Sequence, residues 1–335
     1  MIRVIMSARQ QQAFSVRPFQ PSDYEALAGI RLTVYPEHPL SADELRRTDE
    51  PTRGDARLRH ERFVAECGGA VVAYGEYAQN PGMYHPRRFL LDVAVLPRWR
   101  GRGIGTALFD HVMRMLAPFD PLSVRARARE DAPGVAFLTA RGFRETLRTW
   151  EATLDPRAFD FRPYDGVEDD LRSQGITITT ARGLAARDAS WREQLHDVFS
   201  DTRVDVPRSE PTTPITFEQF VGFIVDDSGF IPDAYFIAVH DGRVIGTSDL
   251  YRSAASDGLF TGFTGVRRAY RGRGVALALK IRALRYARDA GAAWVRTDNA
   301  STNQAMLAVN AKLGFEQEPA WLSMVREGTA IDSTT

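Results

Sequence analysis

Two stretches of the chain repeat each other and hold its densest run of glycine and arginine. Residues 95–108 read VLPRWRGRGIGTAL and residues 266–279 read VRRAYRGRGVALAL, with seven of fourteen positions identical at an offset of 171. Two further landmarks keep nearly this spacing, FVAECGGAVVA at 63–73 with FIAVHDGRVIG at 236–246, and the Gly-Phe pairs at 142–143 and 314–315. Three landmarks in the same order at nearly constant spacing predict two copies of one domain. The offset is too long for a solenoid, whose repeats have periods of about 20–50 residues.

Each copy is predicted to follow the same succession of strands and helices. Asp241-Gly242 between two apolar runs predicts a β-hairpin, and Gly68-Gly69 is compatible with one. Mixed hairpins and strand–helix–strand units predict an α+β or mixed α/β fold. In order, we expect a strand (14–18; 176–180), a helix (23–32; 189–199), the hairpin, a strand (89–95; 262–266), the glycine-rich turn, a helix (104–116; 275–290), a strand (122–128; 293–297) and a last helix before the Gly-Phe pair.

The repeat also predicts the domain boundaries. We expect a first domain over residues 1–155, a linker over 156–172 and a second domain over 173–335, since the linker contains prolines and several charges. The second copy carries an extra stretch at 200–214, rich in proline and acidic residues. A loop of this kind is either a substrate-facing lid or an ordinary surface loop.

Composition excludes several classes of function. Lysine plus arginine and aspartate plus glutamate both number 43, so no nucleic-acid partner is expected, since such binding needs a basic surface. The single Cys67 excludes an internal disulfide and a Cys-rich zinc site, the histidines show no metal-ligand spacing, and no metal is expected. No apolar run could span a membrane, and residues 1–12 are too short in their apolar part for a signal peptide, which predicts a cytoplasmic protein.

The glycine-rich turns predict an anion site. A strand that runs into Arg100–Gly105 or Arg271–Ala276 and then into a helix places backbone N–H groups at a helix N-terminus, where small residues admit a ligand. The ligand is therefore expected to be a phosphate or pyrophosphate. Neither turn has the third glycine of a dinucleotide fingerprint or the Lys-Ser/Thr pair of a Walker loop.

The pattern Arg-x-x-Gly-x-Gly/Ala after a strand, followed by a helix that ends in Gly-Phe, resembles the GNAT superfamily of acyl-CoA N-acyltransferases. The resemblance covers nearly the whole chain and is most specific over Arg271–Phe315. The tandem arrangement is similar to that of mycothiol synthase-like two-domain acetyltransferases. It implies two GNAT-like domains, each a mixed, mostly antiparallel sheet flanked by helices.

The resemblance also implies a cofactor, acetyl-CoA, and the residues that hold it. Backbone amides of both turns would hold the pyrophosphate, namely Arg100, Gly101, Arg102, Gly103, Ile104, Gly105 and Thr106, and Arg271, Gly272, Arg273, Gly274, Val275, Ala276 and Leu277. Strand residues Val93, Ala94 and Val95, and Thr264, Gly265 and Val266, would pair with the pantetheine arm. Asn303 would bond to the cofactor from the region of the last helix.

The catalytic groups depart from the family pattern. Many members have a tyrosine, the acid for the departing thiolate, seven residues after this asparagine. Here that position holds Asn310 in the second copy and Leu138 in the first. Asn310 could orient water or bond to the sulfur, but it cannot protonate a leaving group. The departure therefore bears on turnover and leaves cofactor binding untouched.

A general base is also needed, because only a neutral amine can attack a thioester. Asp249 and Asp257 in the second copy and Glu76 in the first are candidates, and each could equally be a surface or hairpin carboxylate. We predict an N-acetyltransferase that acts on a primary amine of a small molecule, with the chemistry in the second domain and the oligomeric state open. The alternatives are a non-catalytic acyl-CoA-binding sensor and a peptide or protein N-acyltransferase.

Overall fold

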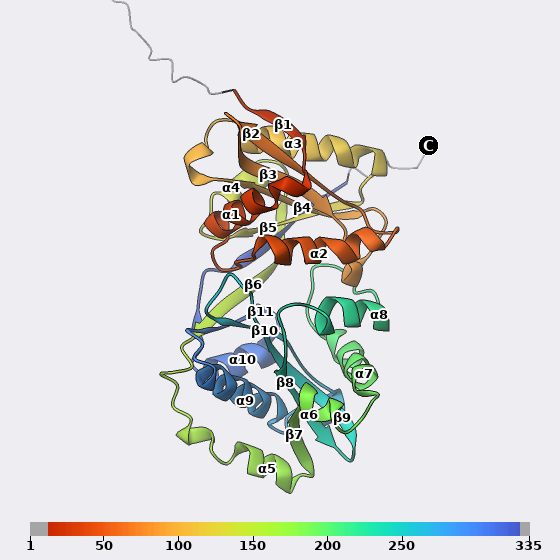
Figure 1. Ribbon diagram of the computed structural model, residues 1–335, viewed down its shortest axis with the longest axis vertical. Coiled ribbons are helices and arrows are strands. Elements are labelled where there is room, and N and C mark those ends of the chain that lie inside the picture. Colours follow the sequence, from red (N-terminus) through yellow and green to blue (C-terminus); the bar gives the residue numbers. More distant parts are fainter. Residues whose placement is uncertain (1–12, 329–335) are drawn as a thin grey trace, which may run out of the picture. The chain divides into compact units, whose positions relative to one another are not determined.

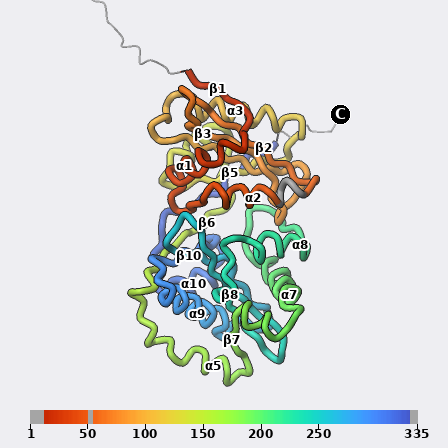
Figure 2. Tube along the Cα trace, viewed as in Figure 1, coloured from red at the N-terminus to blue at the C-terminus, as the bar shows by residue number. Residues whose placement is uncertain are grey.

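The computed structural model describes residues 13–328, with the backbone alone at 51–54 (Figures 1 and 2). These residues form two compact units. The first holds the described residues up to Asn80, His85–Arg125 and the chain from Glu327, and the second holds Pro81–Tyr84 and Ala126–Arg326. Residues 1–12, where we expect no signal peptide, lie outside the described residues. No helix within 13–328 is both long and apolar enough to cross a membrane.

The first unit is built on a sheet with the strand order β1-β2-β3-β4-β5. Neighbouring strands are antiparallel except for β4 and β5, which are parallel. The strands are β1 (Ser15–Pro18), β2 (His60–Cys67), β3 (Ala70–Ala78), β4 (Arg88–Val95) and β5 (Ser123–Arg129), the last of which continues into the second unit. The helices are α1 (Tyr24–Val34), α2 (Ala42–Gly54) and α3 (Ile104–Leu116).

The second unit has the strand order β13-β6-β11-β10-β9-β8-β7, with β12 paired to β6. Its parallel pair is β10 and β11. The strands are β6 (Arg144–Leu154), β7 (Ile176–Thr180), β8 (Phe230–His240), β9 (Arg243–Tyr251), β10 (Leu259–Val266), β11 (Val295–Ala300), β12 (Glu316–Gln317) and β13 (Trp321–Glu327). The helices are α4 (Gly134–Thr139), α5 (Val167–Ser173), α6 (Ala181–Ala185), α7 (Trp191–Arg203), α8 (Phe217–Phe220), α9 (Val275–Asp289) and α10 (Gln304–Lys312).

Helices cover both faces of this second sheet (Figure 1). On one face, α9 and the end of α10 pack through residues such as Leu279, Leu284 and Leu313. On the other, α7 and α8 pack through Leu195 and Phe220. Successive residues of a strand point to opposite faces. Accordingly, Phe236 of β8 joins the α9 core, whereas Tyr235 and Ile237 join the α7 core.

The mixed, mostly antiparallel sheets flanked by helices are the architecture predicted from the sequence. Both hairpin turns have the positive φ angles that Gly68-Gly69 and Asp241-Gly242 favour, and α3 spans the residues expected for it. Helix α2 was not expected. It begins with a capping box, in which Ser41 accepts a hydrogen bond from the backbone of Glu44, whose side chain accepts one from Ser41 in return.

Two segments near the repeat boundary are more structured than their sequence indicates. The linker over 156–172 contains most of α5, which packs against the second unit, where Glu168 forms an ion pair with Arg282. Strand β6 belongs to the first repeat by sequence, yet it pairs antiparallel with β11 from Val295–Leu154 to Ala300–Thr149. The second unit is therefore assembled from both repeats, and the boundary at residue 155 stays a prediction about the repeats.

Candidate functional site

In each unit the two parallel strands pair over a short length and then separate. The β10–β11 register covers Leu259–Val295 and Phe260–Arg296, and the β4–β5 register covers Arg88–Ser123 to Leu90–Arg125. Beyond these pairs β10 continues to Val266, bonded on its other side to β9. The edges of Val93–Val95 and Thr264–Val266 that face away from β3 and β9 thus have no strand partner in the described part of the chain. Such an edge offers backbone groups to an extended ligand.

Each glycine-rich turn leads directly into the N-terminus of a helix. Gly103 and Gly274 are the N-caps of α3 and α9, both at φ 83°, and neither helix has a side-chain cap. A Cβ added at Gly103 or Gly274 would meet no heavy atom within 4 Å. The first intrahelical bond of α9 runs from the Ala278 N–H to the Gly274 carbonyl, so the N–H groups of residues 275–277 make no bond within the helix and can serve a ligand.

The arginine that opens each turn is used structurally. Arg100 Nε donates to the Val95 carbonyl at 3.1 Å, and Arg271 Nε donates to the Val266 carbonyl at 2.8 Å. Each side chain thus ties its turn to the end of its strand. This role depends on the direction of the side chain, which the sequence does not show.

The acidic stretch after α7 reaches the second turn. Asp205 accepts hydrogen bonds from Arg268 Nε at 3.0 Å and from Arg271 Nη2 at 2.6 Å. These bonds hold the pKa of Asp205 below its usual range. Thr213, near the other end of the stretch, donates its N–H to the Gly82 carbonyl at 3.0 Å. The extra stretch is therefore anchored at both ends.

Asp249 lies at an irregularity in the second sheet. Leu250 and Ser248 of β9 pair with Thr261 and Thr264 of β10, so two β10 residues lie opposite Asp249 alone. This is a β-bulge, a feature that re-aims groups next to active sites. The Phe263 N–H donates to Asp249 Oδ1 at 2.8 Å. A Cβ on Gly262 would come within 2.1 Å of Asp249 Oδ2, which explains why this position is glycine.

The Asp249 carboxyl is an unusual acid. Its residue is only 9% exposed, and burial raises its pKa to about 7 against the opposing hydrogen bond from Phe263. It shares the α7 face of the sheet with Tyr235, its partner across β8 and β9. A carboxyl that titrates near neutrality can accept a proton from an amine.

The other predicted residues have different surroundings. Asn303 caps α10 by accepting a hydrogen bond from the Met306 N–H. Asn310 is 5% exposed, and its Oδ1 has no hydrogen-bond partner among the described residues. Asp257 is exposed in the loop before β10, with its backbone carbonyl bonded to Ala293. Within the described part of the chain, no contact of Asp257 supports a catalytic role, so that role stays a prediction. Gly262 and the bulge were not predicted from the sequence.

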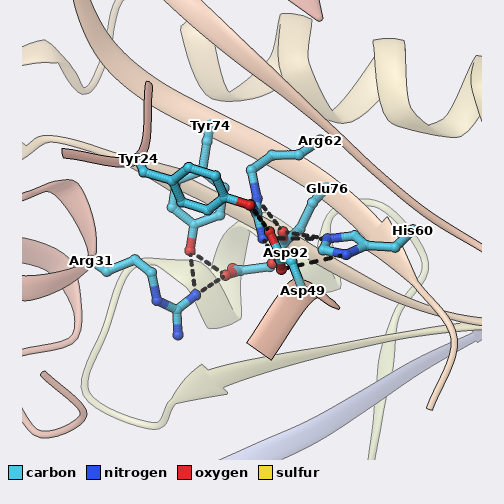
Figure 3. Close-up of polar contacts among 8 residues, drawn as sticks. All are labelled: Tyr24, Arg31, Asp49, His60, Arg62, Tyr74, Glu76 and Asp92. Atoms are coloured by element: carbon cyan, nitrogen blue, oxygen red, sulfur yellow. Dashed lines mark hydrogen bonds and ion pairs between the residues drawn. The ribbon is translucent and has the colours of Figure 1, made fainter. Parts of the chain in front are cut away.

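At the equivalent position of the first unit lies a network of charged and aromatic side chains (Figure 3). Glu76, which matches Asp249 at the offset of 173, accepts a hydrogen bond from Arg62 Nε at 2.6 Å and lies 3.1 Å from His60 Nε2. Burial opposes ionisation of Glu76, but Arg62 and His60 outweigh it and hold its pKa below its usual range. Glu76 is therefore committed to ion pairs and is a poor proton acceptor.

Asp92, opposite Glu76 across β3 and β4, completes this network. Its carboxylate accepts hydrogen bonds from Tyr35 at 2.7 Å and Tyr74 at 2.5 Å, with Arg31 at 3.6 Å. Burial raises the pKa of Asp92, and the nearby Glu76 adds to this. The β3–β4 register runs without interruption from 73–78 to 90–95, so the first unit has no bulge at this point.

Comparison with known proteins agrees with the site's geometry. The model of the acetyltransferase (GNAT) family matches residues 25–143 and 192–315, which confirms the resemblance read from the two turns. The mycothiol acetyltransferase of Thermobifida fusca (strain YX) is 28% identical over 305 residues, 86% of this chain and 88% of that protein. That of Parafrankia sp. (strain EAN1pec) is 28% identical over 281 residues, 79% and 83% of the two chains.

Solved structures share the fold. A tandem GNAT protein from the clavulanic acid biosynthesis pathway superposes with a TM-score of 0.70 at 21% identity, covering 94% of this chain and 99% of that one. A GCN5-related N-acetyltransferase from Sphaerobacter thermophilus gives a TM-score of 0.65 at 21% identity, covering 94% and 95%. The tandem architecture predicted from the repeat is thereby confirmed.

Proposed function

Because the chain belongs to the acetyltransferase (GNAT) family and is an N-acetyltransferase, we propose that it moves an acetyl group from acetyl-CoA to a primary amine of a small molecule, with the chemistry in the second unit. The observation that carries this assignment is the buried Asp249 carboxyl, which titrates near neutrality beside the β10 bulge. The first unit has ion-paired Glu76 at that position. The two mycothiol acetyltransferases among its relatives favour a small acceptor.

The residues present fit acetyl-CoA. Open space above Gly272 and Gly274, both with positive φ, leaves room for a pyrophosphate against the N-terminus of α9. The edge of Thr264–Val266 offers main-chain groups to the pantetheine arm, like an added strand. Arg268 and Arg271 share one carboxylate, Asp205, so a net positive charge remains beside the turn. Acetyl-CoA supplies an activated thioester to which the acceptor adds.

Asp249 would prepare the acceptor. An ammonium has no lone pair, so it must lose a proton before it attacks. A carboxylate with a pKa of about 7 is about half ionised at neutral pH, and can therefore take this proton directly or through water. Its hydrogen bond from the Phe263 N–H fixes the carboxylate at the bulge, on the α7 face of the sheet. A main-chain N–H of Thr264–Val266 would face the thioester carbonyl, where the oxyanion develops.

The test begins with calorimetric titration of CoA and acetyl-CoA into the wild type, Gly103→Glu and Gly274→Glu. A carboxylate in either turn repels the pyrophosphate and fills the open space above the helix. Gly291→Glu is the matched control, because Gly291 also has a positive φ and open space but follows the C-terminal end of α9. We expect Gly274→Glu to remove a binding site and Gly291→Glu to leave it.

Turnover is then tested with a panel of small primary amines and with peptides that have free N-termini. Acetylation of a small amine that is lost in Gly274→Glu and retained in Gly103→Glu supports the proposal. Turnover of peptides alone would instead identify a peptide acyltransferase. CoA binding without turnover of either panel would indicate a sensor, and no binding by the wild type would refute the assignment.

A further inference from the structure

A lysine is buried in the second unit, close to where β10 and β11 separate. Lys280 of α9 is only 3% exposed. Its ammonium donates one long hydrogen bond, of 3.4 Å, to Thr297 Oγ1, and lies 5.2 Å from the centre of the Phe315 ring. An ammonium has three N–H donors. Its hydrogen bond goes to a neutral hydroxyl, and the nearby carboxylate Asp298 acts on it through charge alone.

Burying such a cation is costly and is not required by the fold. Burial lowers the pKa of Lys280 to about 8, and the charge of Asp298 opposes this only in part. The first repeat shows what packing alone would select, because the residue matching Lys280 at the offset of 171 is Phe109, which is buried on α3. An apolar side chain fits this position of the fold, so the lysine calls for another explanation.

The position of Lys280 points to the ligand it would serve. Thr297, which holds the ammonium, follows Arg296, the last residue of β11 that pairs with β10. Phe315 donates its N–H to the Asn310 carbonyl at 3.1 Å. Asn310 itself is buried with Oδ1 unpartnered among the described residues. The Lys280 ammonium thus lies against the Phe315 ring, which packs on the α9 side of the sheet, and the backbone of Phe315 is bonded to that of Asn310 at the end of α10.

Asp249 belongs to the opposite face of the same sheet. It shares the α7 face with Tyr235, whereas Lys280 is on α9. A thioester bound along the unpaired edge of β10 would have a carboxyl on one face and a buried ammonium on the other. Acyl transfer needs this separation, because the amine loses a proton on one side while negative charge grows on sulfur on the other.

We propose that Lys280 stabilises the thiolate form of CoA in the second unit, in place of the tyrosine acid that neither repeat has; this rests on the proposed function. In the step it serves, the amine nitrogen bonds to the acetyl carbon, the carbon–sulfur bond breaks and its electron pair stays on sulfur. Asp249 first passes the proton of the ammonium on to water and, ionised again, takes the proton that the nitrogen loses as the amide forms. The Lys280 ammonium keeps its own proton and offsets the sulfur charge. The thiolate takes a proton from water after release.

Of the charged groups on the elements near α9, Asp298 acts on Lys280, and the others named here have partners of their own. On β11, Arg296 is paired with Glu318, and Asp298 is the carboxylate that acts on Lys280. On β9, Asp249 accepts from Phe263, and on α5, Glu168 is paired with Arg282. With few competing anions near it, the ammonium is available to a charge brought by a ligand, and a low-dielectric surrounding strengthens that attraction.

The test measures the thiol of bound CoA and needs no acceptor. CoA is bound to Gly103→Glu protein, so that only the second unit is loaded, and the thiolate absorbance is followed against pH with desulfo-CoA as the blank. A free thiol has a pKa of about 8.5. We expect the bound thiol to titrate at least about one unit lower with Lys280 than in Lys280→Met. Lys312→Met, at an exposed position on α10, is the matched control.

Calorimetry provides a second readout. It separates a loss of the folded binding site, which weakens both CoA and desulfo-CoA, from a loss of the Lys280 charge, which weakens CoA alone. At pH 8.5, where about half of the free thiol is already ionised, a thiol pKa lowered by about one unit should make the protein with Lys280 prefer CoA to desulfo-CoA by about fivefold. Lys280→Met should lose this preference while it still binds desulfo-CoA. Equal thiol pKa values with and without Lys280, in variants that bind desulfo-CoA equally, would overturn the assignment but leave the proposed function intact. Absence of CoA binding in the wild type would overturn both.

Discussion

Replacing Asp249 by asparagine should stabilise the protein and remove its activity. Asparagine keeps an oxygen that accepts the Phe263 N–H hydrogen bond, but it cannot ionise or take a proton. The wild-type carboxyl prefers to be neutral when folded, since burial raises its pKa from 3.8 to about 7. Stability from this group is therefore fully present below pH 3.8 and is lost as pH rises toward 7.

The size of the effect follows from proton linkage. A shift of about three units corresponds to about 4 kcal/mol at pH 8, of which about 1.5–2 kcal/mol is already lost at pH 5. The stability advantage of Asp249→Asn over the wild type should thus grow by about 2–3 kcal/mol between pH 5 and pH 8. Other groups titrate equally in both proteins and cancel in this double difference.

Urea unfolding at pH 5 and pH 8 measures this difference directly. Acetylation of a small amine should fall by at least about a hundredfold in the variant, and the wild-type rate should rise with pH around 7. An advantage that is the same at both pH values, within about 0.5 kcal/mol, would show that Asp249 ionises normally when folded. The reasoning from its burial would then be wrong.

Three further substitutions test other parts of the site. Gly262→Ala places a Cβ 2.1 Å from Asp249 Oδ2, and should cost about 1–3 kcal/mol of stability in urea unfolding together with most of the activity. Asp205→Asn removes the anion that neutralises Arg271, and should tighten CoA binding by about three- to tenfold at low salt in calorimetry. Glu76→Gln leaves Arg62 undercompensated, and should cost about 3–5 kcal/mol at pH 7 but less as pH falls below the usual glutamate range, because the folded pKa of Glu76 is depressed.

The first two of these substitutions have a control in the same chain. Gly222→Ala meets no atom within 4 Å, and should leave stability within about 0.5 kcal/mol. Asp241→Asn removes an exposed charge at a hairpin turn, and should leave CoA affinity unchanged. Unchanged CoA affinity in Asp205→Asn would mean that the arginines beside the turn do not contribute to binding. A pH-independent cost of Glu76→Gln would mean that its ionisation is not what the network stabilises.

The sequence alone was sufficient for the features that depend on local patterns. Both repeats contain an arginine and two glycines at fixed spacing before a helix. The glycines are needed because the backbone of the turn adopts positive φ angles, a requirement that lies within a dozen residues of sequence. The turns, α3 and α9, the two hairpins and the tandem organisation could therefore be predicted. Asn310 at the position of the missing tyrosine could be found by counting from Gly314-Phe315.

Tertiary structure decided what depends on pairing between distant segments. The β10 bulge exists only in the register of β10 with β9, so Asp249 could not be separated from Asp257 by residue type. Burial raises the pKa of Asp249, and its neighbours Tyr235 of β8 and Phe263 of β10 are brought to it by strand pairing. In the sequence Lys280 is an ordinary helix residue, and only the packing of α9 brings it to Thr297. Likewise, β6 pairs with β11, which is more than 140 residues away in the sequence. A side chain's charge and neighbours are set by the elements that fold against it, which no local pattern records.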